Sequence, residues 1–307
     1  MPSFITALQG GLPLVLARAV FVAALLSMNG TFVFRALIAP KVFAQMSPVL
    51  VAPIERALFR LAWISLAVAG VGIGVWIFLQ AADIAGVTGL GPTFAVLPEV
   101  LEYTQFGHLV LWQAGLLILT GGLLWTRGPV GVIAAAIVTG TNVAMQGTHG
   151  HAMAMDGWFS PLFVADGLHL LAAACWVGGL LPLILVVHLA EPEVGAIAAR
   201  WFSPMGKWCV GVLAGSALIQ GWVMVGSLTA LLNAPYGTLV LIKTALFVVL
   251  FGFAVLNRYG LAPALLRAGP EVARRRLVRS IAAQTVAGCL AVLAAAALSG
   301  LAPTMKM

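Results

Sequence analysis

The chain has 307 residues, of which 62% are hydrophobic and only 8% are charged, and its formal net charge is +7. A soluble domain carries roughly 25% charged residues, so a chain this apolar could not cover its own surface with polar side chains in water. The composition therefore excludes a soluble globular protein. The basic residues lie between apolar stretches and form no stripe with interleaved aromatics, which argues against nucleic acid as a partner.

Eight apolar stretches are long enough to cross a bilayer, which takes about 20 mostly apolar residues. These runs lack the alternation of barrel strands. The first stretch has no basic segment before it and no small-residue cleavage site after it, so we expect a retained helix rather than a signal peptide. The sequence predicts an all-α, polytopic membrane bundle that forms a single domain over residues 1–307. The predicted spans are 14–38, 60–82, 103–125, 129–147, 162–188, 208–231, 238–257 and 279–300.

The connections between these spans alternate in charge. Lys and Arg follow the first, third, fifth and seventh spans, whereas the connections near 83–102, 148–161 and 232–237 contain neither residue type. This alternation follows the positive-inside rule and predicts both termini and the three uncharged or acidic connections on the outer side. We expect the segment 270–279 to be a solvated basic loop near anionic headgroups.

Polar residues at membrane depth are costly and are therefore candidates for function. The chain has five histidines, and the predicted topology places four of them near the outer side. His108 lies inside the third span, His149 and His151 follow the fourth, and His169 lies about 10 Å into the fifth at about 1.5 Å per residue. His188 lies at the inner end, where we interpret it as an interfacial residue.

Methionines surround two of these histidines. Met145, Met153 and Met155 lie within a few residues of His149 and His151. Thioether and imidazole ligands together suit Cu(I) above all, and imidazole alone also suits Cu(II). Zinc would more typically recruit Cys or a carboxylate. The run therefore predicts a copper site, with interfacial residues as the alternative interpretation.

The spacing in this run leaves two geometries open. In an extended chain, positions 149, 151, 153 and 155 point to one face and would give a ligand set of two His and two Met. In a helix, Met145 would instead pair with His149, and His151 with Met155, at four-residue spacing. Gly147 and Gly150 make a continuous helix unfavourable.

A second, deeper group of candidates lies in the third and fifth spans. His169 and His108 would form this deeper metal site, although each is also explained by packing within its helix. Asp166 precedes His169 by three residues on the same helix face and would orient its imidazole as a hydrogen-bond acceptor. Lys243 lies about one turn inside the seventh span, where snorkelling to the surface also explains it. We expect Cys175, Cys209 and Cys289 to be free, buried thiols.

The sequence contains no nucleotide-binding glycine loop, no nucleophile elbow and no zinc-protease motif. No pair of carboxylates lies within the predicted spans. We therefore expect that the protein is not an enzyme.

His169, Trp176 and Gly178-Gly179 of the fifth span, with motifs before and after them, resemble those of the copper resistance protein D (CopD) family of inner-membrane proteins. The strongest similarity is in the fifth span, where His169 is followed by a tryptophan and a double glycine. The family-like C-terminal part covers about 197–300. Gln284 departs from the family pattern, which would have an acidic residue there. The residues that carry the resemblance are Gly107-His108, Gly150-His151, Asp166, His169, Trp176, Gly178-Gly179, Pro182, Arg200 to Ser203, Tyr236-Gly237, Lys243, Asn257-Arg258 and Pro263.

The resemblance implies copper uptake across the inner membrane, alongside a periplasmic copper protein of the CopC type. In this interpretation His149, His151, Met153 and Met155 form an entry site on the periplasmic side, and copper passes inward. Two alternatives remain open. The first is a haem-binding redox protein that uses His108, His151 and His169 as axial ligands. The second is an assembly partner that holds copper without transporting it.

Overall fold

The computed structural model describes residues 10–126, 128–149, 160–267 and 269–302. Within these ranges every regular element is helical, and eight helices are long and apolar enough to cross a membrane. The predicted all-α bundle of eight spans is therefore confirmed. Their bounds in the structure are Gly11–Leu37, Pro48–Ala85, Gln105–Leu123, Pro129–His149, Pro161–Leu189, Pro192–Val225, Pro235–Ala264 and Pro270–Leu298.

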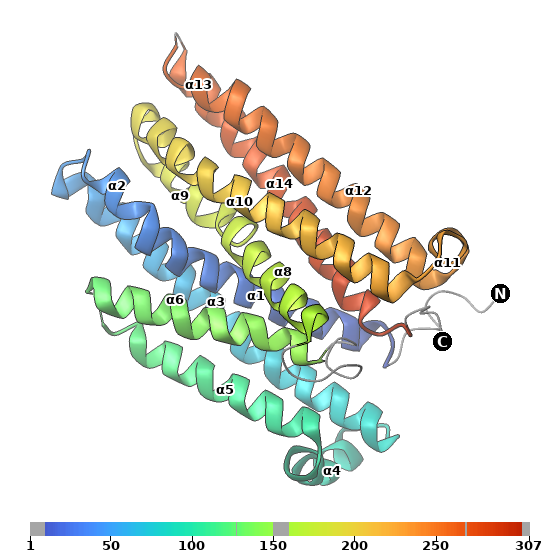
Figure 1. Ribbon diagram of the computed structural model, residues 1–307. Coiled ribbons are helices and arrows are strands. Elements are labelled where there is room, and N and C mark those ends of the chain that lie inside the picture. The colour runs from blue at the N-terminus through green and yellow to red at the C-terminus, as the bar shows by residue number, and fades with distance from the viewer. Residues whose placement is uncertain (1–9, 127, 150–159, 268, 303–307) are drawn as a thin grey trace.

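Figure 1 shows these helices lying side by side along a common direction. Several spans are composite, and short helices join others. The long helices are α1 (Gly11–Leu37), α3 (Pro48–Ala85), α5 (Gln105–Leu123), α6 (Pro129–Ala144), α8 (Pro161–Trp176), α9 (Leu180–Leu189), α10 (Pro192–Val225), α12 (Pro235–Leu256) and α14 (Pro270–Leu298). The shorter elements are α2 (Ala39–Phe43), α4 (Leu90–Tyr103), the 3₁₀ turn η2 (Met145–His149), α11 (Leu228–Asn233), the π-helical turn η3 (Asn257–Leu261) and α13 (Ala262–Ala264).

Proline and small hydroxyl side chains define many of the helix starts. Six of the long helices begin with Pro, whose missing N–H would have no partner in the helix anyway. Ser160 caps α8 by accepting a hydrogen bond from the amide of Phe163, and Thr104 caps α5 through the amide of Gly107.

Several boundaries differ from the sequence prediction, most of all the starts of three helices. The α3 helix begins at Pro48 rather than near 60. The segment 270–279, which we expected to be a loop, forms the first turns of α14, so that interpretation was wrong. Likewise, α10 begins at Pro192 rather than near 208 and ends at Val225, where Gly226 adopts φ 71°. Hydropathy marks only the residues inside the hydrocarbon layer, whereas a helix continues through polar residues until its hydrogen bonding is interrupted, as at Gly226 after α10.

The α1 helix lies at the centre of the bundle and packs against α3, α6, α8, α9 and α14. The backbone of α1 comes very close to the backbone of the junction between α8 and α9. A Cβ added at Gly178 would lie 1.9 Å from the carbonyl oxygen of Leu26, and one added at Gly30 would lie 2.2 Å from the carbonyl carbon of Gly178. The double glycine thus has a packing reason, because only a residue without a side chain permits this crossing.

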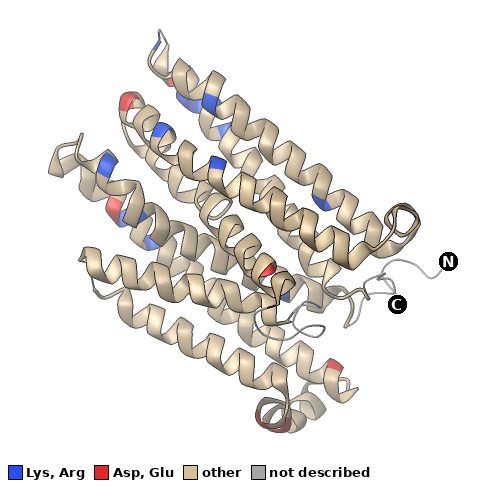
Figure 2. Ribbon diagram, viewed as in Figure 1, with Lys and Arg blue, Asp and Glu red and all other residues tan. Residues whose placement is uncertain are grey.

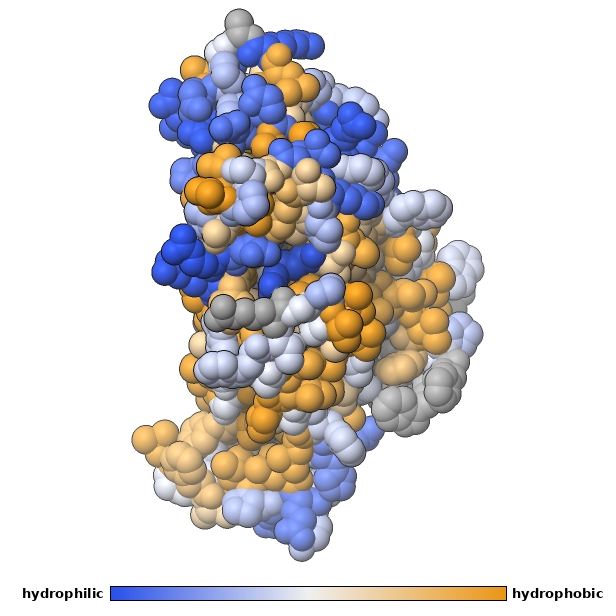
Figure 3. Space-filling view, turned by 90° about the vertical axis from the view of Figure 1, so that its left-hand side faces the viewer, coloured by the Kyte–Doolittle hydropathy of each residue, from blue (hydrophilic) through white to orange (hydrophobic). Residues whose placement is uncertain are grey.

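Most Lys and Arg residues gather at one end of the bundle, whereas Asp and Glu lie at both ends (Figure 2). One end carries the connections with Lys41, Arg56 and Arg274, and we call it the basic end. The opposite end carries Asp83 and Glu102, and we call it the acidic end. The start of α1 and the end of α14 both lie at the acidic end, where they share a buried cluster. Figure 3 shows hydrophilic and apolar regions on the side that lies at the left of Figure 1.

All three cysteines are free, as expected, but they are not all buried. Cys209 is buried and Cys175 is half-buried, whereas Cys289 is exposed on α14. In a membrane this exposed thiol would face lipid.

Candidate functional site

A group of polar side chains lies inside the bundle near the acidic end. Arg18 of α1 is half-buried in an otherwise apolar stretch. Its Nη2 donates to the carbonyl oxygen of His149 at 3.4 Å, and its Cζ lies 5.4 Å from the centre of the Trp76 ring. An intramembrane charge held in this way is a candidate for function.

His149 lies in an aromatic enclosure at the end of η2. The centre of its ring is 4.8 Å from that of Trp76 and 5.7 Å from that of Phe106, both in edge-on geometry. Its Nε2 is 3.0 Å from Oε1 of Gln113. These contacts hold the half-buried imidazole on three sides.

The partners of Gln113 assign the tautomer of His149. Nε2 of Gln113 donates to the carbonyl oxygen of Asn142, which leaves Oε1 as an acceptor toward the histidine. Nε2 of His149 must therefore carry the proton, and the lone pair of the neutral ring resides on Nδ1. A neutral imidazole oriented by a second hydrogen bond is the usual form of a histidine metal ligand.

His169 has an equally defined tautomer. Its Nδ1 lies 2.8 Å from Oγ of Ser216, and this hydroxyl donates its single proton to the carbonyl oxygen of Val212 at 2.6 Å. Ser216 therefore accepts from Nδ1–H, and the lone pair of the neutral ring resides on Nε2. The sequence predicted that Asp166 accepts the orienting hydrogen bond from His169, but in the structure the acceptor for Nδ1 is Ser216 of α10. The hydroxyl lies on a neighbouring helix, so sequence spacing could not reveal it.

Asp166 instead lies among cations and next to η2. It is within electrostatic range of both Lys243 and Arg18. A Cβ added at Gly147 would lie 3.0 Å from Oδ2 of Asp166, so the carboxylate packs against the backbone of η2. Lys243 also acts electrostatically on His169, which connects α12 to the same group.

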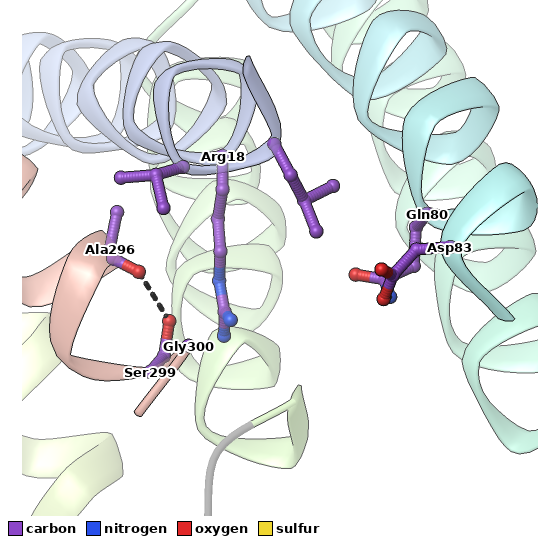
Figure 4. A pocket seen from close by; sticks show the side chains of 8 residues that line it. Arg18, Gln80, Asp83, Ala296, Ser299 and Gly300 are labelled. Atoms are coloured by element: carbon purple, nitrogen blue, oxygen red, sulfur yellow. Dashed lines mark hydrogen bonds between the residues drawn. The ribbon is translucent and has the colours of Figure 1, made fainter. Parts of the chain in front are cut away.

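A small hollow leads from the acidic end to this group. It has a volume of about 50 Å³. Figure 4 shows the side chain of Arg18 pointing between Ser299 and Gly300 on one side and Gln80 and Asp83 on the other. Arg18 is the member of the inner polar group that lines this hollow, so its guanidinium links the group to the acidic end.

The remaining predicted ligands lie apart from this group or outside the described residues. His108 is exposed on α5, and its Nε2 is 2.8 Å from the carbonyl oxygen of Glu102. The α6 helix packs against both α5 and α8, so His108 and His169 have separate surroundings (Figure 1). His188, which the sequence predicts to be an interfacial residue and not a ligand, is exposed at the end of α9. His151, Met153 and Met155 lie outside the described residues.

Met145 is half-buried at the start of η2. The proposed α-helical pairing of Met145 with His149 does not occur, because residues 145–149 form a 3₁₀ turn with three residues per turn. The hydroxyl of Thr148 donates to the carbonyl oxygen of Met145 at 2.6 Å and supports this tighter turn. Among the described residues, no three side chains of His, Cys, Asp or Glu are close enough to hold one metal ion.

Sequence reasoning missed several members of the group. Trp76 and Ser216 gave no sequence signal, because aromatic and hydroxyl residues are common in membrane helices. Gln113 could have been found, since a primary amide inside an apolar span is costly. Arg18 could have been found, since an arginine eight residues into an apolar span is itself unusual.

The fold and this group define a class of protein, namely a polytopic membrane protein with a polar, histidine-containing centre inside its bundle. Residues 7–162 match the family described as copper resistance protein D-like, N-terminal domain, and residues 196–298 match the family described as copper resistance protein D. The first match covers half of the chain. The chain therefore belongs to the copper resistance protein D family, which gives it a copper-related function at a membrane.

Three curated relatives are similar to this chain. Inner membrane protein YebZ of Escherichia coli (strain K12) is 29% identical over 62% of this chain and 69% of its own length. Copper transport protein CutJ of Bacillus subtilis (strain 168) is 36% identical over 27% of this chain, and copper resistance protein D of Pseudomonas syringae pv. tomato is 28% identical over 49%. The matched parts span 16% and 51% of those two relatives. No solved structure matches this chain.

Proposed function

We propose that this chain takes up copper at the periplasmic side of an inner membrane and passes it inward through the bundle. In this proposal the acidic end and both termini face the periplasm. The chain acts as a carrier and not as an enzyme. Copper moves down its own gradient or is coupled to another process, since the sequence has no nucleotide-binding loop. One relative, CutJ, is named a copper transport protein, and this name supports transport of copper rather than storage alone.

The main support for the proposal is that two histidines inside the bundle each have a defined tautomer. His149 and His169 each use one ring nitrogen in a hydrogen bond inside the bundle and keep a lone pair on the other. His149, together with Met145, His151, Met153 and Met155, would form the entry site. His169 would then receive copper deeper in α8. Soft thioethers beside imidazole suit Cu(I).

The surrounding charges support Cu(I) over Cu(II). Arg18 and Lys243 flank the group, and their repulsion acts twice as strongly on a dication as on a monocation. Asp166 offsets part of this repulsion. A periplasmic protein of the CopC type would supply the ion at the acidic end.

The test is Cu(I) binding to the purified, detergent-solubilised protein, measured under reducing conditions by competition with a coloured chelator. The wild type should bind copper. The double variant His149→Ala/His169→Ala should lose more than about 100-fold in affinity, which exceeds the usual effect of losing an orienting partner. His188→Ala, an exposed histidine at the basic end, is the matched control and should bind as the wild type does.

Other results would contradict parts of the proposal. A Soret band in the purified wild type, lost in the double variant, would assign the histidines to haem. If copper binds normally but does not enter proteoliposomes, the protein holds copper without transporting it, and the transport part of the proposal is wrong. Equal affinities in the wild type and the double variant would remove these two histidines from the site.

A further inference from the structure

A second cavity lies in the other half of the bundle from His149 and His169, between α9, α10, α12, η3 and α14. Its volume is about 260 Å³. Most of its lining is apolar, but one end is polar and contains Ser203, Lys207, Asn257 and Arg258. Neither the copper proposal nor the resemblance gives this cavity a role.

The polar end carries positive charge that has no acidic partner. Lys207 and Arg258 line it, and none of the described lining residues is Asp or Glu. Arg258 donates from Nη1 to Oγ of Ser203, while its buried Nε–H lacks a partner among the described residues. The buried Oδ1 of Asn257 also lacks a partner there. A buried donor without an acceptor is costly, so this end is suited to an added anionic group.

A local departure from α-helical geometry places these residues. Asn257 and Arg258 begin the π-helical turn η3 at the end of α12. Pro263 has no N–H and its ring would clash with the carbonyl of Tyr259, so the regular hydrogen-bond ladder cannot continue. π turns of this kind occur frequently at functional sites.

The depth of the cations matches the headgroup layer. From Pro235, where α12 begins at the acidic end, the chain rises about 35 Å to Arg258 at about 1.5 Å per residue. From the end of α10 at Val225, the same rise gives about 27 Å to Lys207. A hydrocarbon core about 30 Å thick that starts at these two helix ends would therefore end near both cations.

The apolar part of the cavity reaches the surface that faces lipid. Phe251 and Val255 of α12 line it and are 48% and 40% exposed. Leu180 and Leu183 of α9 form the wall behind them. Gln284 also lines the cavity, and its side-chain oxygen accepts a hydrogen bond from Asn257 at 3.1 Å.

We propose that this cavity binds an anionic phospholipid, with its phosphate at Lys207 and Arg258 and part of one acyl chain against Phe251 and Val255. Charge complementarity selects the headgroup, and the apolar opening toward the membrane selects a lipid over a water-soluble anion. A hydroxylated headgroup such as glycerol would also donate to Oδ1 of Asn257. Basic pockets between transmembrane helices bind anionic headgroups through the same chemistry.

The test is lipid binding to the full-length, delipidated protein, measured by native mass spectrometry in detergent. Phosphatidylglycerol and phosphatidylcholine with identical acyl chains are the two probes. The wild type should bind phosphatidylglycerol at least about tenfold more tightly, and each of Lys207→Gln and Arg258→Gln should reduce this preference by about fivefold. Arg274→Gln is the matched control, because Arg274 lies at the same end but pairs with Glu271 at 2.6 Å and does not line the cavity.

A second variant tests whether the acyl chain occupies the apolar part of the cavity, and it leaves Arg258 unchanged. Ala254→Trp fills the apolar part and should weaken binding of both lipids, with the fold checked by thermal unfolding. Equal binding of the two lipids by the wild type would overturn the proposal. So would full displacement of phosphatidylglycerol by inorganic phosphate, which would assign the cavity to a free anion, or an equal loss in Arg274→Gln. Copper binding should be unaffected in every variant.

Discussion

At the scale of single residues, hydrogen-bond partners decide which nitrogen of each histidine is available to a metal. Ser216 fixes Nδ1 of His169 and leaves Nε2 with the lone pair, whereas Gln113 fixes Nε2 of His149 and leaves Nδ1. The two rings thus present different nitrogens. Their orientation comes from helices α10 and α5, which carry no ligand themselves.

Replacing Ser216 by Ala should weaken copper binding without removing a ligand. The imidazole of His169 would lose its acceptor and its defined tautomer, and we expect a 10- to 100-fold loss in Cu(I) affinity, which is about the effect of losing an orienting partner. Chelator competition measures this loss. Thr285→Ala is the control, because Thr285 also bonds a carbonyl in its own helix, at 2.9 Å, but lies on α14 away from the histidines. Equal losses in the two variants would contradict an orienting role for Ser216.

At the scale of elements, the sequence predicted the number and order of the spans but not the full length of their helices. Hydropathy is a property of consecutive residues, so it located every membrane crossing. It could not predict that α14 starts at Pro270 or that η2 is a 3₁₀ turn, because these features depend on hydrogen bonds outside the apolar layer.

The candidate site also had features that the sequence could predict and features that it could not. His149, His169, Asp166 and Lys243 were visible in the sequence, because polar side chains in apolar spans are rare. Their partners were not visible, because a contact such as that between His169 and Ser216 joins residues on separate helices. Gln284 also illustrates this limit. Its amide accepts from Asn257 and donates to the carbonyl oxygen of Leu250 at 3.1 Å, so a neutral amide satisfies both partners where a carboxylate would lose the donor.

Gly178 provides a test of the packing between elements. In Gly178→Ala the new Cβ would overlap the backbone of Leu26, so α1 and the α8–α9 junction must separate. We expect a loss of about 3 kcal/mol in the free energy of unfolding, the upper end of the usual overpacking effect, because backbone cannot rotate away. Denaturant unfolding in detergent, followed by tryptophan fluorescence, measures it. Gly70→Ala is the control, since no atom lies within 4 Å of its added Cβ. A stable Gly178→Ala protein would show that this crossing is not tight.

At the scale of the whole molecule, the two ends differ in both charge and chemistry. The histidine group and the hollow beside Arg18 lie toward the acidic end, while the cavity with Lys207 and Arg258 lies toward the basic end. If the positive-inside rule sets the orientation, the histidines face the periplasm and the cationic cavity faces the inner leaflet. The proposal for copper entry from the periplasm depends on this orientation, and so does the leaflet from which the cavity would take its lipid.

Thiol labelling of intact cells with a membrane-impermeant maleimide tests the orientation directly. Asp83→Cys at the acidic end should react from outside, whereas Glu191→Cys at the basic end should react only after the membrane is permeabilised. Both positions are exposed, and the wild type is the control because its three cysteines all lie within membrane-spanning helices. The reverse pattern would place the histidines at the cytoplasmic side. Copper would then meet His149 and His169 from inside the cell, so the same ligands would serve export and the proposed direction of transport would be wrong.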